Sequence, residues 1–172
     1  TKEGKAGHEA MSWGEYTDVP GLENCSAVPN VSDTCGTDGY KNTQAILDYA
    51  TLTGRSFPAA RAVSKFEPEG CTGKFCKAGN WFLPSAADFN KMEKLRGVVA
   101  QAMADLNLGW EGLSYYDGQS RAQHTNLWSS TEADRSHAAW VYFNSENCAA
   151  YGMGGTFPLD RASAYVRPAV KY

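Results

Sequence analysis

The stretch GNWFLPSAADFNKM, residues 79–92, decides the fold. An apolar run leads into Pro84, which has no amide hydrogen to continue a strand ladder, so a short strand should end there. Ser85 then offers a side-chain oxygen to the first turn of a helix, and Asp88 stands where the partner of a capping box belongs. The segment therefore predicts a junction between a strand and a helix.

Apolar residues recur at helical spacing after this junction, which predicts a helix with one buried face that ends near Gly109. The stripe comprises Phe89, Met92, Leu95, Val99, Met103 and Leu106. Two further helices are expected earlier in the chain. One should run from a cap at Asn42 or Thr43 to Gly54, and a shorter one should cover Pro58–Phe66.

The C-terminal part contains a second informative block, LWSSTEADRSHAAWVYFN at residues 127–144. Strands are predicted at Leu127–Ser130, Ala139–Phe143 and Tyr165–Val170, separated by turn residues. Residues 144–163 are rich in glycine and small side chains and are predicted to form a loop. Helices followed by strands indicate the α+β class. We expect two or three N-terminal helices packed on a small twisted antiparallel sheet with long loops.

The length and the charge of the chain narrow the range of functions that it can have. A chain of 172 residues suits one compact domain, here residues 40–172, preceded by an irregular extension at residues 1–39 that is rich in turn-forming residues. The formal net charge is −3 and the basic residues are scattered, which disfavours nucleic acid as a partner. No apolar run approaches the roughly 18–20 residues that span a bilayer, so direct membrane insertion is not expected.

Five cysteines fall into two local pairs and one remainder. Cys25 and Cys35 flank one turn-rich loop, Cys71 and Cys76 flank another, and Cys148 is left over. Disulfides within each pair would stiffen chain that the core cannot hold, and would indicate an oxidising compartment. Free thiols are the alternative. A zinc site is disfavoured because neither pair has the C-x-x-C spacing and only three histidines are present.

The blocks at residues 79–92 and 127–144, with AYVRPAV at residues 164–170, carry a resemblance to a known family. They resemble the C-type-lectin-like domains first described at the C-terminus of a Legionella collagen-like protein, a group common in bacterial surface proteins. The resemblance implies the C-type-lectin fold over residues 40–172 and ligand binding by loops on a rigid scaffold. Within this framework, Trp81 and Trp128 are expected to be core residues.

The calcium-binding motifs of sugar-binding C-type lectins are missing from the expected positions. Those proteins use a Glu-Pro-Asn or Gln-Pro-Asp loop and a Trp-Asn-Asp strand as oxygen ligands. We therefore expect no metal site and no cofactor.

Many variable proteins of diversity-generating retroelements resemble this C-terminal block as well. Their adenine-directed mutagenesis of AAC codons cannot create Lys, Gln, Glu, Met or Trp. Within residues 133–165 only Trp140, Glu146 and Met153 belong to that set, whereas such residues are more frequent elsewhere in the chain. The pattern suggests a loop region that such an element could diversify.

Aromatic, acidic, basic and amide side chains in the C-terminal loops combine contact area with adaptable hydrogen bonding, as binding surfaces require. We expect them to form one exposed face around Trp140 that binds a protein or carbohydrate ligand on another cell or surface. The predicted ligand-binding residues are Tyr115, Tyr116, Asp117, Asp134, Arg135, His137, Trp140, Tyr142, Asn144, Asn147, Tyr151, Phe157, Asp160 and Arg161.

The sequence favours a ligand-binding adhesin or receptor-recognition domain of a bacterial or phage surface protein. It would act outside the cell or at its surface as part of a longer exported protein. A structural module of a pilus or surface array is the alternative. A formylglycine-generating-type enzyme is disfavoured because such enzymes use paired cysteines and only Cys148 lies in the C-terminal part. No G-x-S-x-G motif is present and the histidines are isolated, so we predict no catalytic residues.

Overall fold

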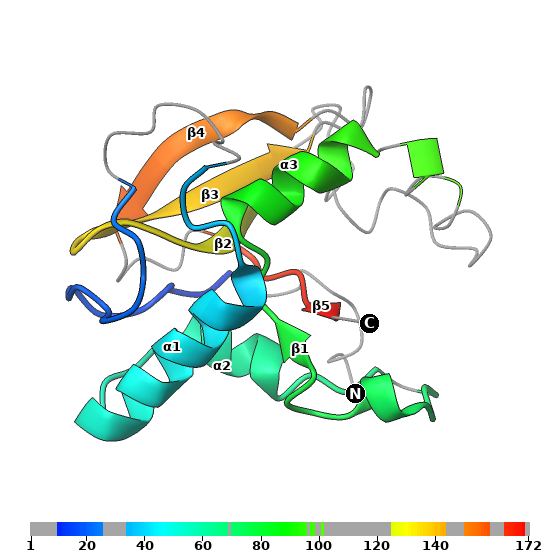
Figure 1. The fold of residues 1–172 in the computed structure, drawn as a ribbon, viewed down its shortest axis with the longest axis horizontal. Helices are drawn as coiled ribbons and strands as arrows, with labels where there is room; N and C mark the ends of the chain where they lie inside the picture. The colour runs from blue at the N-terminus through cyan, green and yellow to red at the C-terminus, as the bar shows by residue number, and fades with distance from the viewer. Residues whose placement is uncertain are drawn as a thin grey trace.

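The computed structural model describes residues 10–25, 34–68, 70–95, 97–98, 101, 125–143, 150–158 and 164–170. In chain order its elements are α1 (Gly39–Thr53), α2 (Pro58–Ser64), the 3-10 helix η2 (Lys74–Cys76), β1 (Trp81–Phe82), α3 (Ala86–Lys94), β2 (Thr125–Asp134), β3 (His137–Phe143), β4 (Ala150–Pro158) and β5 (Ala169–Val170). Helices combined with small antiparallel sheets confirm the predicted α+β class (Figure 1).

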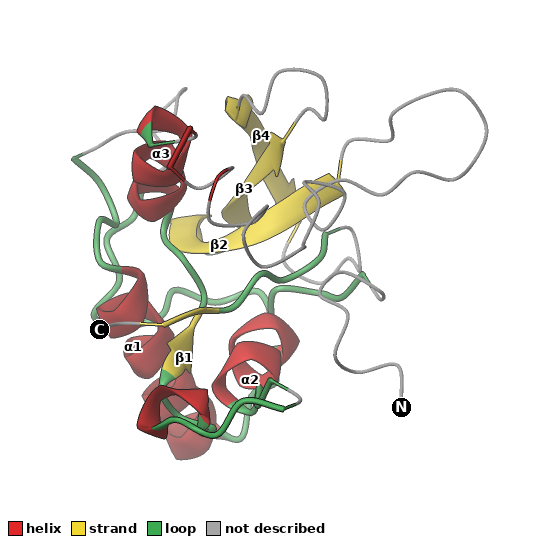
Figure 2. Ribbon diagram, turned by 90° about the vertical axis from the view of Figure 1, so that its right-hand side faces the viewer, coloured by secondary structure: helices red, strands yellow, loops and turns green. Residues whose placement is uncertain are grey.

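Two sheets organise the described part of the chain. Strands β2, β3 and β4 form an antiparallel sheet in that order, while β1 pairs with β5 in a separate two-stranded sheet. Helix α3 contacts all three strands of the larger sheet, and α1 and α2 lie below it with β1 (Figures 1 and 2). The outer edge of β2 is covered, because Leu127 forms a parallel bridge with Tyr165 and the Ser130 amide donates to the Pro84 carbonyl at 2.8 Å. Covering an edge in this way removes a strand that could pair with another chain.

The first helix begins one turn earlier than predicted. Its N-cap is Asp38, whose carboxylate accepts the Lys41 amide at 3.0 Å, and not Asn42 or Thr43. Both predicted caps lie inside the helix and are buried, because their side chains serve tertiary contacts instead of a helix end. The predicted end at Gly54 is confirmed: this residue has φ 72°, a left-handed conformation that glycine adopts without strain.

The capping box at the start of α3 is confirmed. The Ser85 hydroxyl accepts the Asp88 amide at 3.0 Å, and the Asp88 carboxylate accepts the Ser85 amide at 3.0 Å. The helix ends at Lys94, however, and Leu95 is 57% exposed, so its predicted inward position is wrong. Leu95 follows the last helical turn, where helical spacing no longer sets the direction of a side chain. The later residues of the predicted stripe lie outside the described residues.

The prediction of a continuous loop at residues 144–163 is wrong, because β4 lies within it. Its ladder with β3 contains two register shifts, one between Ala139 and Val141 and one between Val141 and Phe143. Such bulges, with three glycines in the strand, interrupt the regular alternation that marks a strand in a sequence. The predicted strand at residues 165–170 is shorter than expected, since only β5 is a paired strand there.

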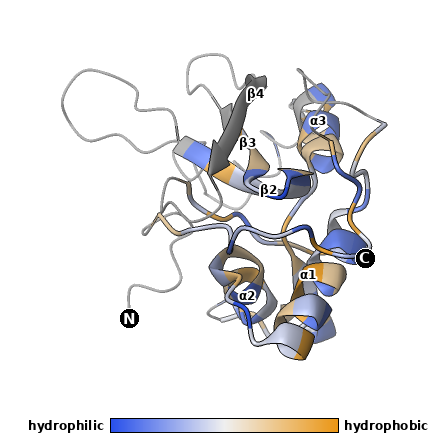
Figure 3. Ribbon diagram, turned by 90° about the vertical axis from the view of Figure 1, so that its left-hand side faces the viewer, coloured by the Kyte–Doolittle hydropathy of each residue, from blue (hydrophilic) through white to orange (hydrophobic). Residues whose placement is uncertain are grey.

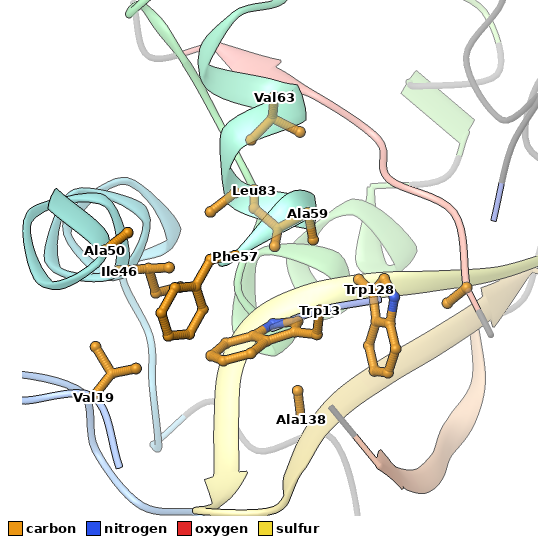
Figure 4. Close-up of a cluster of buried hydrophobic side chains, with 12 residues drawn as sticks. Trp13, Val19, Ile46, Ala50, Phe57, Ala59, Val63, Leu83, Trp128 and Ala138 are labelled. Carbon is orange, nitrogen blue, oxygen red and sulfur yellow. The ribbon is translucent and has the colours of Figure 1, made fainter. Parts of the chain in front are cut away.

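The core draws on residues from both sides of the predicted boundary at residue 39. Trp13 and Val19 are 1% and 2% exposed and belong to the same cluster as Phe57 and Trp128 (Figure 4). The Trp13 ring meets Phe57 edge to face at 5.7 Å, a favourable arrangement for aromatic rings. Residues 10–25 have the irregular backbone that was predicted, yet they complete this core.

Both core tryptophans also satisfy their indole nitrogens. Trp13 Nε1 donates to the Ser129 carbonyl at 2.8 Å, and Trp128 Nε1 donates to the Met11 carbonyl at 2.7 Å. Trp128 is fully buried, which confirms the prediction for that residue. Trp81 is only half-buried and packs against Phe66 at 5.0 Å, outside the main cluster. The prediction that it is a core residue is therefore wrong.

Both predicted disulfides are present. Cys25 is bridged to Cys35 and Cys71 to Cys76, with Cα–Cα distances of 6.0 Å and 5.6 Å. Cys148 lies outside the described residues. Among the helices that the structure describes, none has both the length and the apolar character required to cross a membrane.

Replacing Trp128 with Ala should lower the free energy of unfolding by about 3–5 kcal/mol, because it opens a cavity and leaves the Met11 carbonyl without its donor. Urea denaturation of the native chain and the variant measures the difference. Trp81→Ala is the matched control and should cost less than half as much, since that ring is half-buried. Equal losses from the two replacements would contradict the assignment of Trp128 to the core.

Removing each disulfide by paired Cys→Ala replacements should destabilise the protein to different extents. Chain-entropy arguments give about 2.7 kcal/mol for the ten-residue separation of Cys25 and Cys35, and about 2.1 kcal/mol for the five-residue separation of Cys71 and Cys76. Peptide mapping without reduction should first recover both bridges. Recovery of a bridge to Cys148 would show that the pairing is different.

Candidate functional site

A buried polar segment, Ser129–Glu132 in β2, supports the candidate site. Its four residues are 0%, 0%, 2% and 2% exposed. In Figure 3 part of β2 carries the blue of hydrophilic residues, although the strand lies between β3 on one side and helices α1 and α2 on the other. Polar groups in such a position destabilise a fold unless they find hydrogen-bond partners.

The buried polar segment finds partners on several elements. The Ser129 hydroxyl donates to the Ala139 carbonyl of β3 at 2.8 Å. The Ser130 hydroxyl accepts from the Asn42 amide nitrogen of α1 at 3.3 Å. The Thr131 hydroxyl accepts the backbone amide of Ala86, at the start of α3, at 3.0 Å. These contacts fix β2 against three other elements.

Gly36 makes this arrangement possible beside the first disulfide. Its carbonyl accepts hydrogen bonds from Asn42 at 3.2 Å and from the Thr131 hydroxyl at 3.3 Å. Its φ of 58° is in the left-handed region, and a Cβ there would lie 2.9 Å from the Thr131 methyl carbon. Glycine is therefore the residue that fits this position.

Glu132 ends the buried polar segment and binds the N-terminal part of the chain. Its carboxyl oxygens accept the Val19 amide at 3.2 Å and 3.4 Å, and its backbone carbonyl accepts the Cys25 amide at 3.1 Å. Burial raises the pKa of Glu132 to about 7; the Val19 hydrogen bond lowers it, while Asp18 and Asp134 add to the increase.

The candidate site is the hairpin turn Asp134–His137, which joins β2 to β3. Asp134 pairs with His137 across the turn, leaving Arg135 and Ser136 at its tip. Asp134 Oδ1 accepts the Ser136 amide at 2.7 Å and lies 2.9 Å from His137 Nδ1. A carboxylate bound to the backbone two residues ahead stabilises a tight turn locally.

The turn presents charged groups at the surface. The side chains of Asp134 and His137 are 38% and 36% exposed, and Arg135 is exposed. Burial alone would raise the pKa of Asp134, but hydrogen bonds from the Ser136 amide and the His137 ring outweigh it and lower that pKa. The turn therefore combines a guanidinium at its tip with a carboxylate and an imidazole at its two ends, and these groups can bind a polar ligand.

The structure brings three of the predicted binding residues together in this turn, namely Asp134, Arg135 and His137. Trp140 lies three residues beyond His137 on β3, so strand alternation puts it on the opposite face. There it is partly buried against the main core. Trp140 was predicted to lie at the centre of the binding face. In the structure, Asp134, Arg135 and His137 lie together in the turn, and Trp140 does not lie among them.

Three more predicted residues are described by their backbone alone. Phe157 pairs with Ala138, near the hairpin turn. Tyr142 pairs with Asn126, and Tyr151 directly follows the start of β4, toward the other end of the sheet. Five residues separate Tyr142 from His137, which corresponds to roughly 17 Å along a strand. The remaining predicted residues lie outside the described residues: Tyr115, Tyr116, Asp117, Asn144, Asn147, Asp160 and Arg161.

One group of metal-ligating residue types comes together in the described part of the chain. The side-chain ligand atoms of Glu23, Cys25 and Cys35 lie within 4.8 Å of one another. Both sulfurs are joined in the disulfide, so neither is available as a thiolate ligand. The Glu23 carboxylate also accepts the Gly36 amide at 2.6 Å. The cluster is a structural cross-link.

Sequence reasoning missed Glu132 and its partner Val19. The sequence does not identify Glu132 as a buried residue, and it places Val19 in the irregular extension at residues 1–39. A useful signal was available in Trp13, because a large aromatic residue inside an otherwise polar segment indicates that the segment reaches a core.

No protein-family model matches this chain, and no curated protein or solved structure matches it either.

Asp134→Ala should weaken the hairpin because it removes the acceptor for the Ser136 amide and the partner of His137. A loss of less than about 1 kcal/mol is expected at pH 7, since more than a third of each side chain is exposed and water screens the pair. A lowered pKa means that the carboxylate stabilises the fold above its usual value of 3.8, and that this stabilisation disappears as the pH falls through the folded-state pKa.

Thermal denaturation at pH 7 and at pH values below 3.8 tests this expectation, with Arg135→Ala as the control in the same turn. The control should behave like the native chain throughout. A difference between Asp134→Ala and the native chain that is equal at both pH values would contradict the role of the carboxylate.

Proposed function

We propose that this chain is a ligand-binding domain with the C-type-lectin fold, part of an exported bacterial or phage surface protein, and that it is not an enzyme. The observation that carries the proposal is the hairpin turn Asp134–His137. It exposes charged side chains at the end of a strand whose preceding residues are buried and hydrogen-bonded. Binding residues on a turn that a rigid scaffold positions are a common arrangement in recognition proteins.

The positions of the family-like blocks support the fold part of the proposal. The WFLPS sequence spans β1 and the N-terminus of α3, and WSSTE lies in β2. The first and last described segments also meet, because Met11 forms an antiparallel bridge with Ala164. Two sheets with helices α1 and α2 on one side are compatible with a C-type-lectin-like arrangement.

The two disulfides support the part of the proposal that places the domain outside the cytoplasm. Bridges such as Cys25–Cys35 and Cys71–Cys76 persist in oxidising surroundings, including the cell exterior and the bacterial periplasm. An exported protein that displays the domain at a surface is consistent with them.

The chemistry of the turn favours a polar ligand. Arg135 offers several donors in a planar fork, while His137 and Asp134 can accept or donate according to protonation. Among the described residues, no hydroxyl or thiol forms a hydrogen bond with the His137 ring, so the Asp–His pair has no partner there that it would activate as a nucleophile. A carbohydrate or a polar protein loop fits such a surface.

Diversification by a retroelement is the more specific part of the proposal. Arg135 and His137 lie within residues 133–165, where the side chains that such mutagenesis cannot create are rare. Arg135 is exposed, so replacing it would leave the core intact. Sequencing this locus in sister isolates should show variation concentrated in such codons beside a nearly identical template repeat; uniform variation along the gene would contradict this part of the proposal.

Binding itself is tested with the labelled chain on an array of neutral and acidic oligosaccharides and on purified cell-surface glycoproteins. Binding of the chain to the array should persist in EDTA. For a ligand bound in this way, Arg135→Ala and His137→Ala should each weaken the affinity by about tenfold or more, as replacement of a residue central to an interface does. Their melting temperatures should stay close to that of the native chain.

Arg61→Ala is the matched control, because Arg61 is exposed on α2, away from the turn. It removes the same charge and should leave affinity unchanged. Equal weakening by Arg61→Ala and Arg135→Ala would indicate binding through overall charge, and would contradict a binding site at the hairpin turn.

A further inference from the structure

Glu132 connects two parts of the chain that are distant in sequence. The segment Asp18–Cys25 runs beside the end of β2 and is attached there at two points, through the Val19 amide and the Cys25 amide. The Val19 attachment uses the carboxyl group of Glu132, whereas the Cys25 attachment uses its backbone carbonyl. The first of these contacts depends on the protonation state of a side chain, and the second does not.

The charged surroundings of this carboxyl group are acidic. Asp18 faces it from the N-terminal segment, and Asp134 faces it from β2 itself. His137 on β3 is engaged with Asp134 at 2.9 Å, and Glu23 accepts the Gly36 amide. Glu132 is 2% exposed, so water cannot solvate a negative charge there. A negative charge on Glu132 therefore meets desolvation, which is the largest effect, and repulsion from neighbouring carboxylates; the Val19 hydrogen bond favours the charge but is outweighed.

We infer that Glu132 is a proton-controlled latch, which holds the segment Asp18–Cys25 on β2 when its carboxyl group is protonated and loosens the segment when that group ionises. This inference goes beyond the proposed function and does not depend on it. The latch joins the N-terminal part of the domain to the strand that leads into the hairpin turn.

The direction of the pH dependence follows from burial. The folded-state pKa of Glu132 is raised from 4.5 to about 7. Contact between the segment and β2 is therefore strongest below pH 4.5, weakens as the pH rises from there to about 7, and changes little above it. An opened segment would let water reach the carboxylate, which is the physical reason that ionisation favours opening.

The opening should remain local. On one side of the segment, Trp13 is buried in the core and hydrogen-bonded to Ser129. On the other side, Cys25 is fixed by its bridge to Cys35. Residues between two such anchors can detach and return without unfolding the helices, as cooperative local openings do in other proteins.

Hydrogen exchange of backbone amides, followed by NMR between pH 5 and pH 8 and corrected for intrinsic exchange rates, tests the latch in the oxidised full chain. The protection factor of the Val19 amide should fall by about tenfold or more over this range. Amides in α1 serve as the internal reference for larger openings, and they should stay better protected than Val19 at every pH.

Two variants separate the latch from general effects of pH. Glu132→Gln keeps a carbonyl oxygen for the Val19 amide but cannot ionise, so its Val19 protection should be independent of pH. Asp18→Asn removes one repelling charge and should make the fall smaller, with its midpoint at a lower pH. This second variant remains informative if Glu132→Gln fails to fold.

Val19 protection that falls equally in the native chain and in Glu132→Gln would overturn the latch, as would protection in the native chain that does not change with pH. If Glu132→Gln does not fold, an Asp18→Asn profile identical to the native one would overturn it. Val19 protection equal to that of the most protected α1 amides at every pH would show exchange through global unfolding in place of local release, and would also overturn it.

Discussion

Four consecutive polar residues, Ser129–Glu132, lie on a strand that the protein buries almost completely, and each requires a hydrogen-bond partner before the strand can be buried at all. The partners come from β3, from α1, from the start of α3 and, for Glu132, from Val19 in the N-terminal part of the chain. Hydrophobic burial would hold these elements together without fixing their relative positions. Directional hydrogen bonds add that constraint, because a shift of β2 by one residue would leave several buried groups without partners.

The same strand explains why the proposed binding turn can be exposed without weakening the fold. Between Ser129 and Ala133 β2 is buried, and at Asp134 it reaches the surface. The turn is closed locally, by a carboxylate that accepts the Ser136 amide and contacts His137. Stability is therefore concentrated in the buried residues, and the proposed recognition is assigned to the residues that follow. Changes at Arg135 can alter the surface while the hydrogen bonds of the buried polar segment remain in place.

The parts of the fold that depend on neighbouring residues could be predicted from the sequence. The capping box of Ser85 and Asp88, the helix end at Gly54 and the two short-range disulfides all involve residues close together in the chain. Long-range contacts could not be predicted in the same way. Trp13 joins the core through a partner 116 residues away, and β4 is defined by its pairing with β3 although bulges obscure its alternation. The candidate site was predicted in part, since Asp134, Arg135 and His137 meet across one turn, whereas Trp140 faces the core.

Glutamine could make the same contact with Val19 without an ionisable group, so a carboxyl group at residue 132 makes the stability of the domain depend on pH. This dependence on pH arises from the position of the carboxyl group along β2. A glutamate two residues further along the strand would reach solvent, as Asp134 does, and its charge would be hydrated. A glutamate among the preceding residues would meet α1 or α3, and ionisation would disrupt the packing of a helix. At residue 132 the carboxyl group contacts an irregular segment between two anchors. Release of that segment would remove the core contacts of its own residues Val19 and Leu22, while the helices keep the contacts they make with one another.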